Sequence, residues 1–374
     1  MTRTRLVGLS TATLVLVLAG CYSKPPETAK VVEEKFEGPS IAGYEAMPIP
    51  ADNKMTRAKV ELGKQLFYDK RLSSDGSVSC YSCHLKEHGL TDGKPTAIGA
   101  HGAKLPRSSP TLWNIGYHTA FYWDGRSASL EKQALAAWTG PNMGVWGKGV
   151  KDKEDRPSKE EITAKVNAIP GYKGQFQKVF GGPATPENMM QAIVAFERTI
   201  VADKSAWIRF RSGDEAAFSE EAKRGWKIFG EKAKCTNCHD GLLLTDQQYH
   251  NVGVGMDKEK PDGGRANFTK DAKDTGAFKT PTLLDISKSA PYFHDGSVKT
   301  LEEAVDVMLK GGMKWSVYSL TTSGVQHDDK EKNKYLDRKN LQPVRLTKAE
   351  KADLLAFLKA LDVDYTIAEP QLPN

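Results

Sequence analysis

The sequence is poor in several features, and each absence excludes a class of protein. Only five of its 374 residues are cysteine, and four of them fall in two short motifs. Runs of alternating β-branched residues are scarce, which argues against a fold built on sheets. No phosphate-binding loop or dinucleotide fingerprint occurs, and a net charge of +6 is too small to indicate a nucleic-acid partner. The remaining possibilities are mainly helical proteins whose chemistry depends on the cysteine motifs.

The two motifs have the same form, C-x-x-C-H. They are Cys80-Tyr-Ser-Cys83-His84 and Cys235-Thr-Asn-Cys238-His239. This spacing is typical of covalent haem c attachment, in which two thiols bond the haem vinyl groups and the adjacent imidazole binds the iron. A zinc ribbon would need cysteine pairs that lie close together in sequence, and a thiol redox pair does not need the histidine. We therefore predict two covalently bound haems, with His84 and His239 as proximal iron ligands.

The N-terminus has the pattern of an export signal. Arg3 and Arg5 precede an apolar run over residues 6–19, which is too short to span a bilayer. Leu18-Ala19-Gly20-Cys21 resembles the lipobox of bacterial lipoproteins, which predicts a signal peptide over 1–20 and a lipid on Cys21. An ordinary signal peptide is the alternative. Tyr22 favours the outer membrane, so we expect a periplasmic protein anchored to a membrane by its lipid alone.

The rest of the chain predicts an all-α fold. Residues 21–45 are rich in proline and charge and are expected to form a flexible tether. The capping boxes Ser158/Glu161, Thr300/Glu303 and Thr347/Glu350 each precede apolar residues at helical spacing. Thr185 and Pro186 begin a further expected helix. We predict two cytochrome c-like domains with long loops, over 46–205 and 206–374, because each half of the body contains one haem motif.

A series of strings around the two motifs resembles one known family, the bacterial di-haem cytochrome c peroxidases. The resemblance extends from about Leu62 to Leu361. It includes Gly63–Phe67, Pro106-Arg107, Ser109–Thr111, Tyr122-Trp-Asp-Gly-Arg126, Gln133, Tyr249–Gly253, Phe278–Thr282 and Pro291-Tyr-Phe-His-Asp-Gly296. Two haem motifs alone would be unspecific, but these strings in this order are specific.

The resemblance implies different roles for the two haems. The first would reduce hydrogen peroxide, and the second would pass electrons to it from a small cytochrome c or copper protein. Met308, in the helix expected from Thr300 to Lys310, would be the second ligand of the second iron; packing is its alternative role. Trp123 would relay electrons between the haems, and Arg126 would pair with a haem propionate. Asp124 would cap or turn the chain.

The first haem site departs from the family pattern. Family members place a Gln and then a Glu over the peroxide side, and here these positions are Gln133 and Met143. Cleaving peroxide requires a group that moves a proton between its oxygens, which Met cannot do. His101, in a loop that otherwise matches the family, is a candidate either to ligate the first iron or to act as acid and base. A solvent-facing loop histidine is the alternative. His88 and His118 are expected at the surface.

Calcium and the oligomeric state stay open. The family builds a calcium site from an Asn side chain and backbone carbonyls; the Asn position is Ser108 here, with carbonyls expected from Ser289 and Pro291. Serine offers a poorer oxygen, so both a bound and an absent calcium remain alternatives. A homodimer is likewise one alternative.

Three functions compete at this stage. The first is a peroxidase supplied with electrons by a small redox protein. The second is a MauG-like enzyme that oxidises Trp or Tyr of a partner protein; that branch has Tyr where Met308 stands. The third is a di-haem electron carrier with no chemistry of its own.

Overall fold

A computed structural model describes residues 1, 36, 38–146, 156–256, 258–313, 334–364 and 367–374, together with the backbone of two short strands, Ser316–Tyr318 and Gln326–Asp328. The expected signal peptide, Cys21 and most of the tether fall outside the described residues. Lys35–Asn374 form one compact unit. Within the described ranges, every helix is too short or too polar to span a lipid bilayer.

The described part is mainly helical, as predicted. Its α-helices are α1 (Arg57–Tyr68), α2 (Leu130–Trp138), α3 (Lys159–Ala168), α4 (Pro170–Phe180), α5 (Pro186–Glu197), α6 (Ala206–Arg211), α7 (Glu220–Lys227), α8 (Ala266–Thr269), α9 (Leu301–Leu309) and α10 (Lys348–Lys359). The strands are only two or three residues long: β1 (Tyr249–His250) pairs antiparallel with β2 (Phe278–Lys279), and β3 (Ser316–Tyr318) with β4 (Gln326–Asp328).

Short helical turns connect these elements. They are η1 (Lys70–Leu72), η2 (Tyr81–Cys83), η3 (Lys86–His88), η4 (Ala100–Gly102), η5 (Ile115–Tyr117), η6 (Glu215–Ala217), η8 (Cys235–Asn237) and η9 (Ala272–Asp274), and the π-helical turn η7 (Ile228–Lys232) that continues α7. The haem motifs begin at η2 and η8, so each motif lies on a tight turn.

The predicted helix starts are confirmed. The side chains of Ser158, Thr300 and Thr347 each accept a hydrogen bond from the backbone N–H three residues on, and the paired Glu accepts one from the backbone N–H of the cap residue. Thr185 caps α5 in the same way, with Asn188 as its reciprocal partner. Each of these reciprocal bonds satisfies backbone N–H groups that a helix start would otherwise leave without partners.

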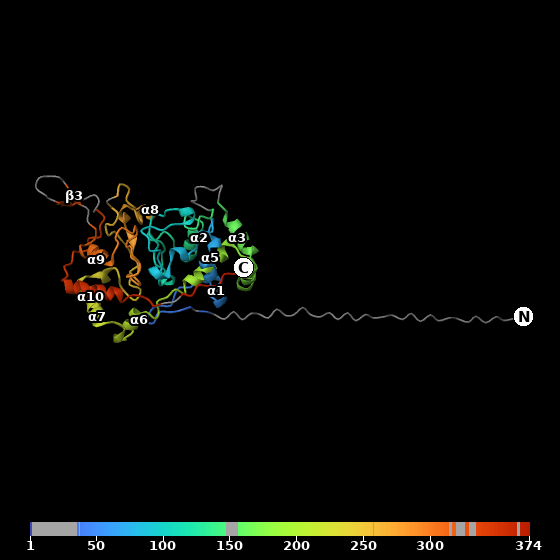
Figure 1. Ribbon diagram of the computed structural model, residues 1–374, viewed down its shortest axis with the longest axis horizontal. Helices are drawn as coiled ribbons and strands as arrows, with labels where there is room; N and C mark the ends of the chain where they lie inside the picture. Colours follow the sequence, from blue (N-terminus) through green and yellow to red (C-terminus); the bar gives the residue numbers. More distant parts are fainter. Residues whose placement is uncertain are drawn as a thin grey trace. The chain divides into compact units, whose positions relative to one another are not determined.

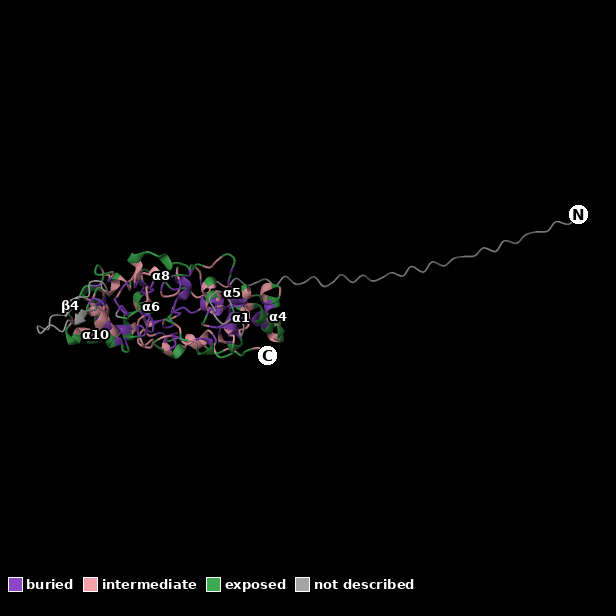
Figure 2. Ribbon diagram, turned by 90° about the horizontal axis from the view of Figure 1, so that it is seen from above, coloured by how far each residue is buried: buried purple, intermediate pink, exposed green. Residues whose placement is uncertain are grey.

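The helices gather in two groups. Around the first motif, α5 packs against α1 and α2, and α4 against α1 and α3; around the second, α10 packs against α7 and η7. In Figure 1 the first group lies beside the C-terminus and the second near α6 and α9. Figure 2 shows buried residues running through the inside of both groups, with exposed residues on their outer faces.

A glycine allows the central helix pair of each group to cross closely. A Cβ on Gly63 of α1 would lie 1.8 Å from the carbonyl oxygen of Ala192 in α5, and one on Gly225 of α7 would lie 2.0 Å from that of Asp353 in α10. Any side chain at these positions would force the helices apart. The two groups therefore use the same local packing device, although they lie far apart in sequence.

Candidate functional site

The first haem motif places a histidine with one ring nitrogen already bonded. Nδ1 of His84 lies 3.0 Å from the carbonyl oxygen of Leu90. A carbonyl only accepts hydrogen bonds, so Nδ1 carries the proton and Nε2 keeps its lone pair. Burial lowers the pKa of His84, which also favours the neutral ring. This second bond orients the imidazole and leaves Nε2 ready to bind a metal.

The second motif repeats this arrangement. Nδ1 of His239 lies 3.1 Å from the carbonyl oxygen of Leu244, and burial again lowers the pKa of the imidazole. Leu90 and Leu244 both have positive φ angles, 63° and 54°. Such angles are costly for a leucine, and here they turn each carbonyl back toward the histidine of its motif.

Each histidine opens onto a cavity that also contains the two thiols of its motif. The first cavity has a volume of about 780 Å³ and the second about 300 Å³. These four cysteines form no disulfide, and burial raises the pKa of Cys80, Cys83 and Cys235. Two thiols and a neutral imidazole beside an apolar cavity are the donor set that covalent haem c requires. The residues of both sites therefore fit the predicted cofactor.

The two cavities share one wall, and Trp123 lies in it. Nε1 of Trp123 donates to the carbonyl oxygen of Ser108 at 3.0 Å, and its own carbonyl accepts from the backbone N–H of Lys279 at 2.7 Å. Tyr122 and His294 line both cavities as well. The predicted relay position of Trp123 is thus between the cavities, held by one contact from each half of the chain.

Met308 lines the second cavity together with His239. It is the penultimate residue of α9, and Leu301 and Val305 on the same helix face are buried beside that cavity. Thr300 and Lys310, the expected helix limits, are the two caps. The structure therefore brings Met308 to the cavity where the sequence placed it.

Gln133 and Met143 both line the first cavity. Gln133 lies in the middle of α2, and Met143 follows that helix with a side chain that is 6% exposed. The backbone N–H of Met143 donates to the carbonyl oxygen of Ala137, and its carbonyl accepts from Ser74 at 2.9 Å. Two predicted site residues thus reach one cavity, although neither of them can transfer a proton at neutral pH.

His101 lies outside both cavities, where neither an iron ligand nor a catalytic acid is expected. It is absent from the residues that line the two cavities, and its side chain is 38% exposed. Nε2 lies 2.8 Å from the hydroxyl of Ser74, and its backbone N–H donates to Asp75 at 2.6 Å. A ligating role for His101 would require this loop to move.

Arg126 is expected to hold a propionate, but the structure gives its guanidinium a protein partner. Nη1 lies 2.9 Å from Asp124, and the guanidinium stacks on the ring of Tyr122 at 3.5 Å. Arg107 is the more buried guanidinium of this cavity, with a side chain that is 12% exposed and ion pairs to Asp124 and Asp262. Nothing near Arg107 in the sequence distinguishes it from Arg126, because the ion pair to Asp262 joins distant segments.

The expected calcium ligands reach one region of the molecule. Ser108, Ser289 and Pro291 all line the second cavity. The hydroxyl of Ser108 donates to the carbonyl oxygen of Phe293 at 3.0 Å, and that of Ser289 to Ile286 at 3.3 Å. These contacts do not test calcium binding, which stays a prediction from the sequence.

The expectation for His118 was wrong. Its ring is 8% exposed, and Nδ1 accepts a hydrogen bond at 2.9 Å from Lys279, whose own side chain is 8% exposed. Burial, and next the charge of Lys279, hold the pKa of His118 well below its usual value, and burial lowers that of Lys279 to about 8. No local signal marked His118 as buried, because Lys279 of β2, which covers it, comes from the other half of the chain.

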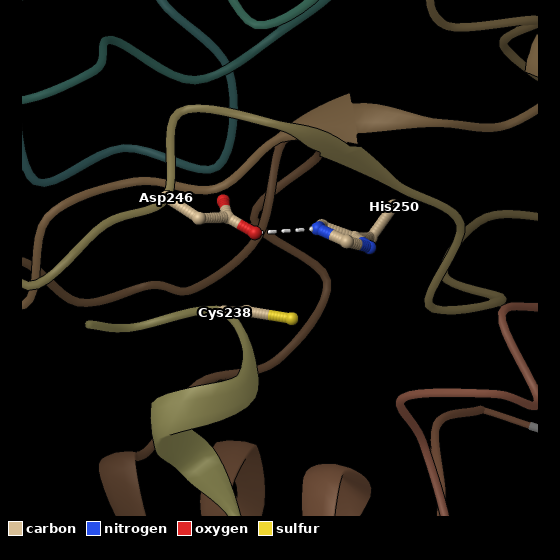
Figure 3. A group of neighbouring side chains, drawn as sticks. All are labelled: Cys238, Asp246 and His250. Atoms are coloured by element: carbon tan, nitrogen blue, oxygen red, sulfur yellow. Dashed lines mark hydrogen bonds and ion pairs between the residues drawn. The ribbon is translucent and has the colours of Figure 1, made fainter.

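A cluster beside the second motif has the residue types of a metal site. Ligand atoms of Cys238, Asp246 and His250 all lie within 4.8 Å of one another (Figure 3). Both nitrogens of His250 are bonded, however, Nε2 to Asp246 at 2.9 Å and Nδ1 to Asp337 at 2.6 Å. Cys238, then the two carboxylates, raise the pKa of His250 to about 10. An imidazolium has no lone pair for a metal, so the cluster is an ion network.

The chain is similar to known proteins over most of its length. Residues 57–216 match the family described as di-haem cytochrome c peroxidase. The methylamine utilization protein MauG of Methylorubrum extorquens is 36% identical over 334 residues, which cover 88% of this chain and 85% of that protein. The cytochrome-c peroxidase IdrP1 of Denitromonas iodatirespirans is 36% identical over 382 residues, 93% of each chain.

A solved structure gives the same result in three dimensions. The crystal structure of a MauG-like protein associated with microbial copper homeostasis has a TM-score of 0.72 and 33% identity, and the match covers 90% of this chain and 95% of that one. Together with the two cavities and their thiol and imidazole donors, these similarities establish one conclusion. The chain belongs to the di-haem cytochrome c peroxidase family, a family of oxidoreductases that includes MauG.

Proposed function

We propose that this protein reduces hydrogen peroxide at its first cavity with electrons that a small cytochrome c or cupredoxin delivers at its second. The proposal rests on one observation, namely that the two cavities differ in volume and in the residues that line them. The smaller one has a thioether, Met308, in addition to His239, whereas the larger one combines His84 with Gln133 and more free volume. A saturated iron suits electron transfer, and an open one suits a substrate.

The reaction needs two electrons and two protons for each peroxide, and yields two water molecules. When bound, the haems supply the redox chemistry. Cys80, Cys83 and His84 would hold the first, and Cys235, Cys238, His239 and Met308 the second. Trp123 would conduct electrons through the shared wall, since its indole is fixed there by Ser108. The amide of Gln133 would orient peroxide by hydrogen bonding.

Met143 is the feature that sets this pocket apart. By the family pattern a carboxylate is expected there, and a thioether can neither donate nor accept the proton that peroxide cleavage moves. The pocket would therefore cleave peroxide slowly, or receive its protons from another group. In the arrangement described, His101 could serve only after its bonds to Ser74 and Asp75 break.

A second candidate function is MauG-like oxidation of Trp or Tyr in a partner protein. The similarity to MauG and to the MauG-like structure favours it. Met308 argues against the mechanism of that branch, which by the family pattern uses Tyr at this position. A di-haem electron carrier is the third candidate, and the loss of the distal acid keeps it in contention.

Stepwise reductive titration of the holoprotein, with spectra and added peroxide at each step, separates the three. A peroxidase opens its first iron after one electron and turns over peroxide rapidly with reduced cytochrome c. A MauG-like enzyme instead gives a long-lived oxidised state that modifies aromatic residues of a co-purified protein. If both irons remain six-coordinate and inert to peroxide in every redox state, the protein is a carrier and the proposal is wrong.

The remaining proposals concern its place in the cell and its assembly. The N-terminal pattern supports export to the periplasm with a lipid on Cys21, and mass spectrometry of the mature protein would test it. We also propose a calcium site at Ser108, Ser289 and Pro291. A homodimer is a further proposal. The two helix groups support haem domains over 46–205 and 206–374.

A further inference from the structure

The first cavity contains a buried carboxyl group that the mechanism above does not use. Glu197 is the last residue of α5, and it is 6% exposed. It lines the cavity with Met190 and Ile193, which lie seven and four residues earlier on the same helix face. Its position at the end of α5 places it within electrostatic reach of the Cys80 thiol.

Four carboxyl groups line this cavity, and three of them are held by cations. Asp124 and Asp262 pair with Arg107, and Asp295 pairs with Lys258 at 2.8 Å. Glu197 differs, because its Oε2 is buried and has no hydrogen-bond partner among the residues that the structure describes. A buried carboxylate in this state would be costly, whereas a neutral acid is tolerated much better.

The neighbouring charges do not neutralise Glu197. Nη2 of Arg198 is already taken by Glu131 of α2 at 2.7 Å. On α1, Lys59 bonds Asn53 and Lys54. The pKa of Glu197 is raised to about 8, by burial first, with Arg198 opposing the effect and Glu131 adding to it. The group is therefore mostly protonated at neutral pH and close to losing its proton.

We propose that Glu197 is a proton-binding site of the first cavity, which takes up one proton when the iron held by His84 is reduced and releases it on oxidation. An added electron in a cavity of low dielectric favours the neutral acid, and its removal favours the carboxylate. The inference rests on the proposed function only in placing a redox-active iron there. It gives the pocket a proton carrier that Met143 does not provide.

The test measures the reduction potential of the first haem in the holoprotein against pH, without peroxide or donor. From about pH 6 to about pH 9 we expect the potential to fall with a slope that approaches about 59 mV per unit, the value for one proton per electron. Glu197→Gln should flatten this slope. Glu187→Gln, an exposed position on the same helix, is the matched control and should keep it. An unchanged slope in Glu197→Gln overturns the proposal.

A second measurement remains decisive if Glu197→Gln fails to retain haem. The reduced-minus-oxidised infrared spectrum of the unaltered holoprotein should gain the carbonyl band of a protonated carboxylic acid, and Glu197→Asp should shift that band. Absence of any such band overturns the proposal. If the unaltered holoprotein shows the expected slope of potential against pH but does not turn over peroxide, only the proposed function is contradicted.

Discussion

Introducing a carboxyl group at position 143 is the most direct test of the first cavity. The backbone around Met143 is fixed by hydrogen bonds on both sides. Ser74 donates to its carbonyl at 2.9 Å, and Ala100 donates to that of Asn142 at 3.0 Å. Met and Glu have side chains of similar length, so Met143→Glu should place a carboxyl group where the thioether now faces the cavity.

The expected gain follows from the burial of this position. A carboxyl group at a site that is 6% exposed has a raised pKa, which brings it toward the range that suits proton transfer at neutral pH. General acid–base catalysis is worth about 10²- to 10⁴-fold, or about 3 to 5 kcal/mol of barrier. Allowing for imperfect geometry, we expect the peroxide reaction to become at least about tenfold faster. The cost in stability should be about 1–3 kcal/mol, because no residue is prepared to bond the new group.

The assay is stopped-flow mixing of half-reduced holoprotein with peroxide. Met143→Gln is the matched control, since it has nearly the same shape as Met143→Glu but transfers no proton near pH 7. We expect acceleration in the Glu variant only. Equal rates in the two variants, with haem fully attached in both, would refute the idea that position 143 faces the peroxide.

Other parts of the site give predictions that can be tested in the same preparation. Trp123→Phe should slow oxidation of the second haem after peroxide is added and leave both haems attached, because it removes the indole and its bond to Ser108; an unchanged rate would exclude the relay. Met308→Ala should convert the second haem from a low-spin to a high-spin spectrum and lower its potential; unaltered spectra would show that Met308 only packs. Trp113→Phe should lower the free energy of unfolding by about 1–3 kcal/mol in chemical denaturation, because the bond from Nε1 to Asp285 at 2.7 Å is buried, and Trp146→Phe, at a position that is 37% exposed, serves as its control.

The parts of the fold that could be predicted from the sequence are those with local causes. The capping boxes at Ser158, Thr300 and Thr347 and the cap at Thr185 were predictable because the two partners of each lie three residues apart. The two C-x-x-C-H motifs, which predict haem attachment, are local in the same way. The position of Met308 needed only a helix of known start and an apolar face that reaches a cavity.

The parts that could not be predicted depend on contacts between distant segments. Nothing near His118 indicates burial, since Lys279 arrives from the other half of the chain. The role of Arg107 was not predicted, because its ion pair to Asp262 also joins distant segments. In the sequence, Glu197 resembles an ordinary polar residue at the end of an amphipathic helix. Only the structure shows that Arg198 pairs with Glu131 and that Oε2 of Glu197 has no hydrogen-bond partner among the described residues.

Local contacts and contacts between distant segments together explain why two motifs of the same form lie in unequal cavities. The local causes are duplicated: each motif has a histidine bonded to a leucine carbonyl of positive φ, and each helix pair crosses at a glycine. The two cavities differ in the residues away from the motifs. Helix α9 supplies Met308 to the second cavity, and a loop supplies Met143 to the first. A helix holds a side chain rigidly, whereas a loop residue can be exchanged without repacking the helices. We therefore expect Met143→Glu to change the chemistry of the first cavity without repacking the helices around it.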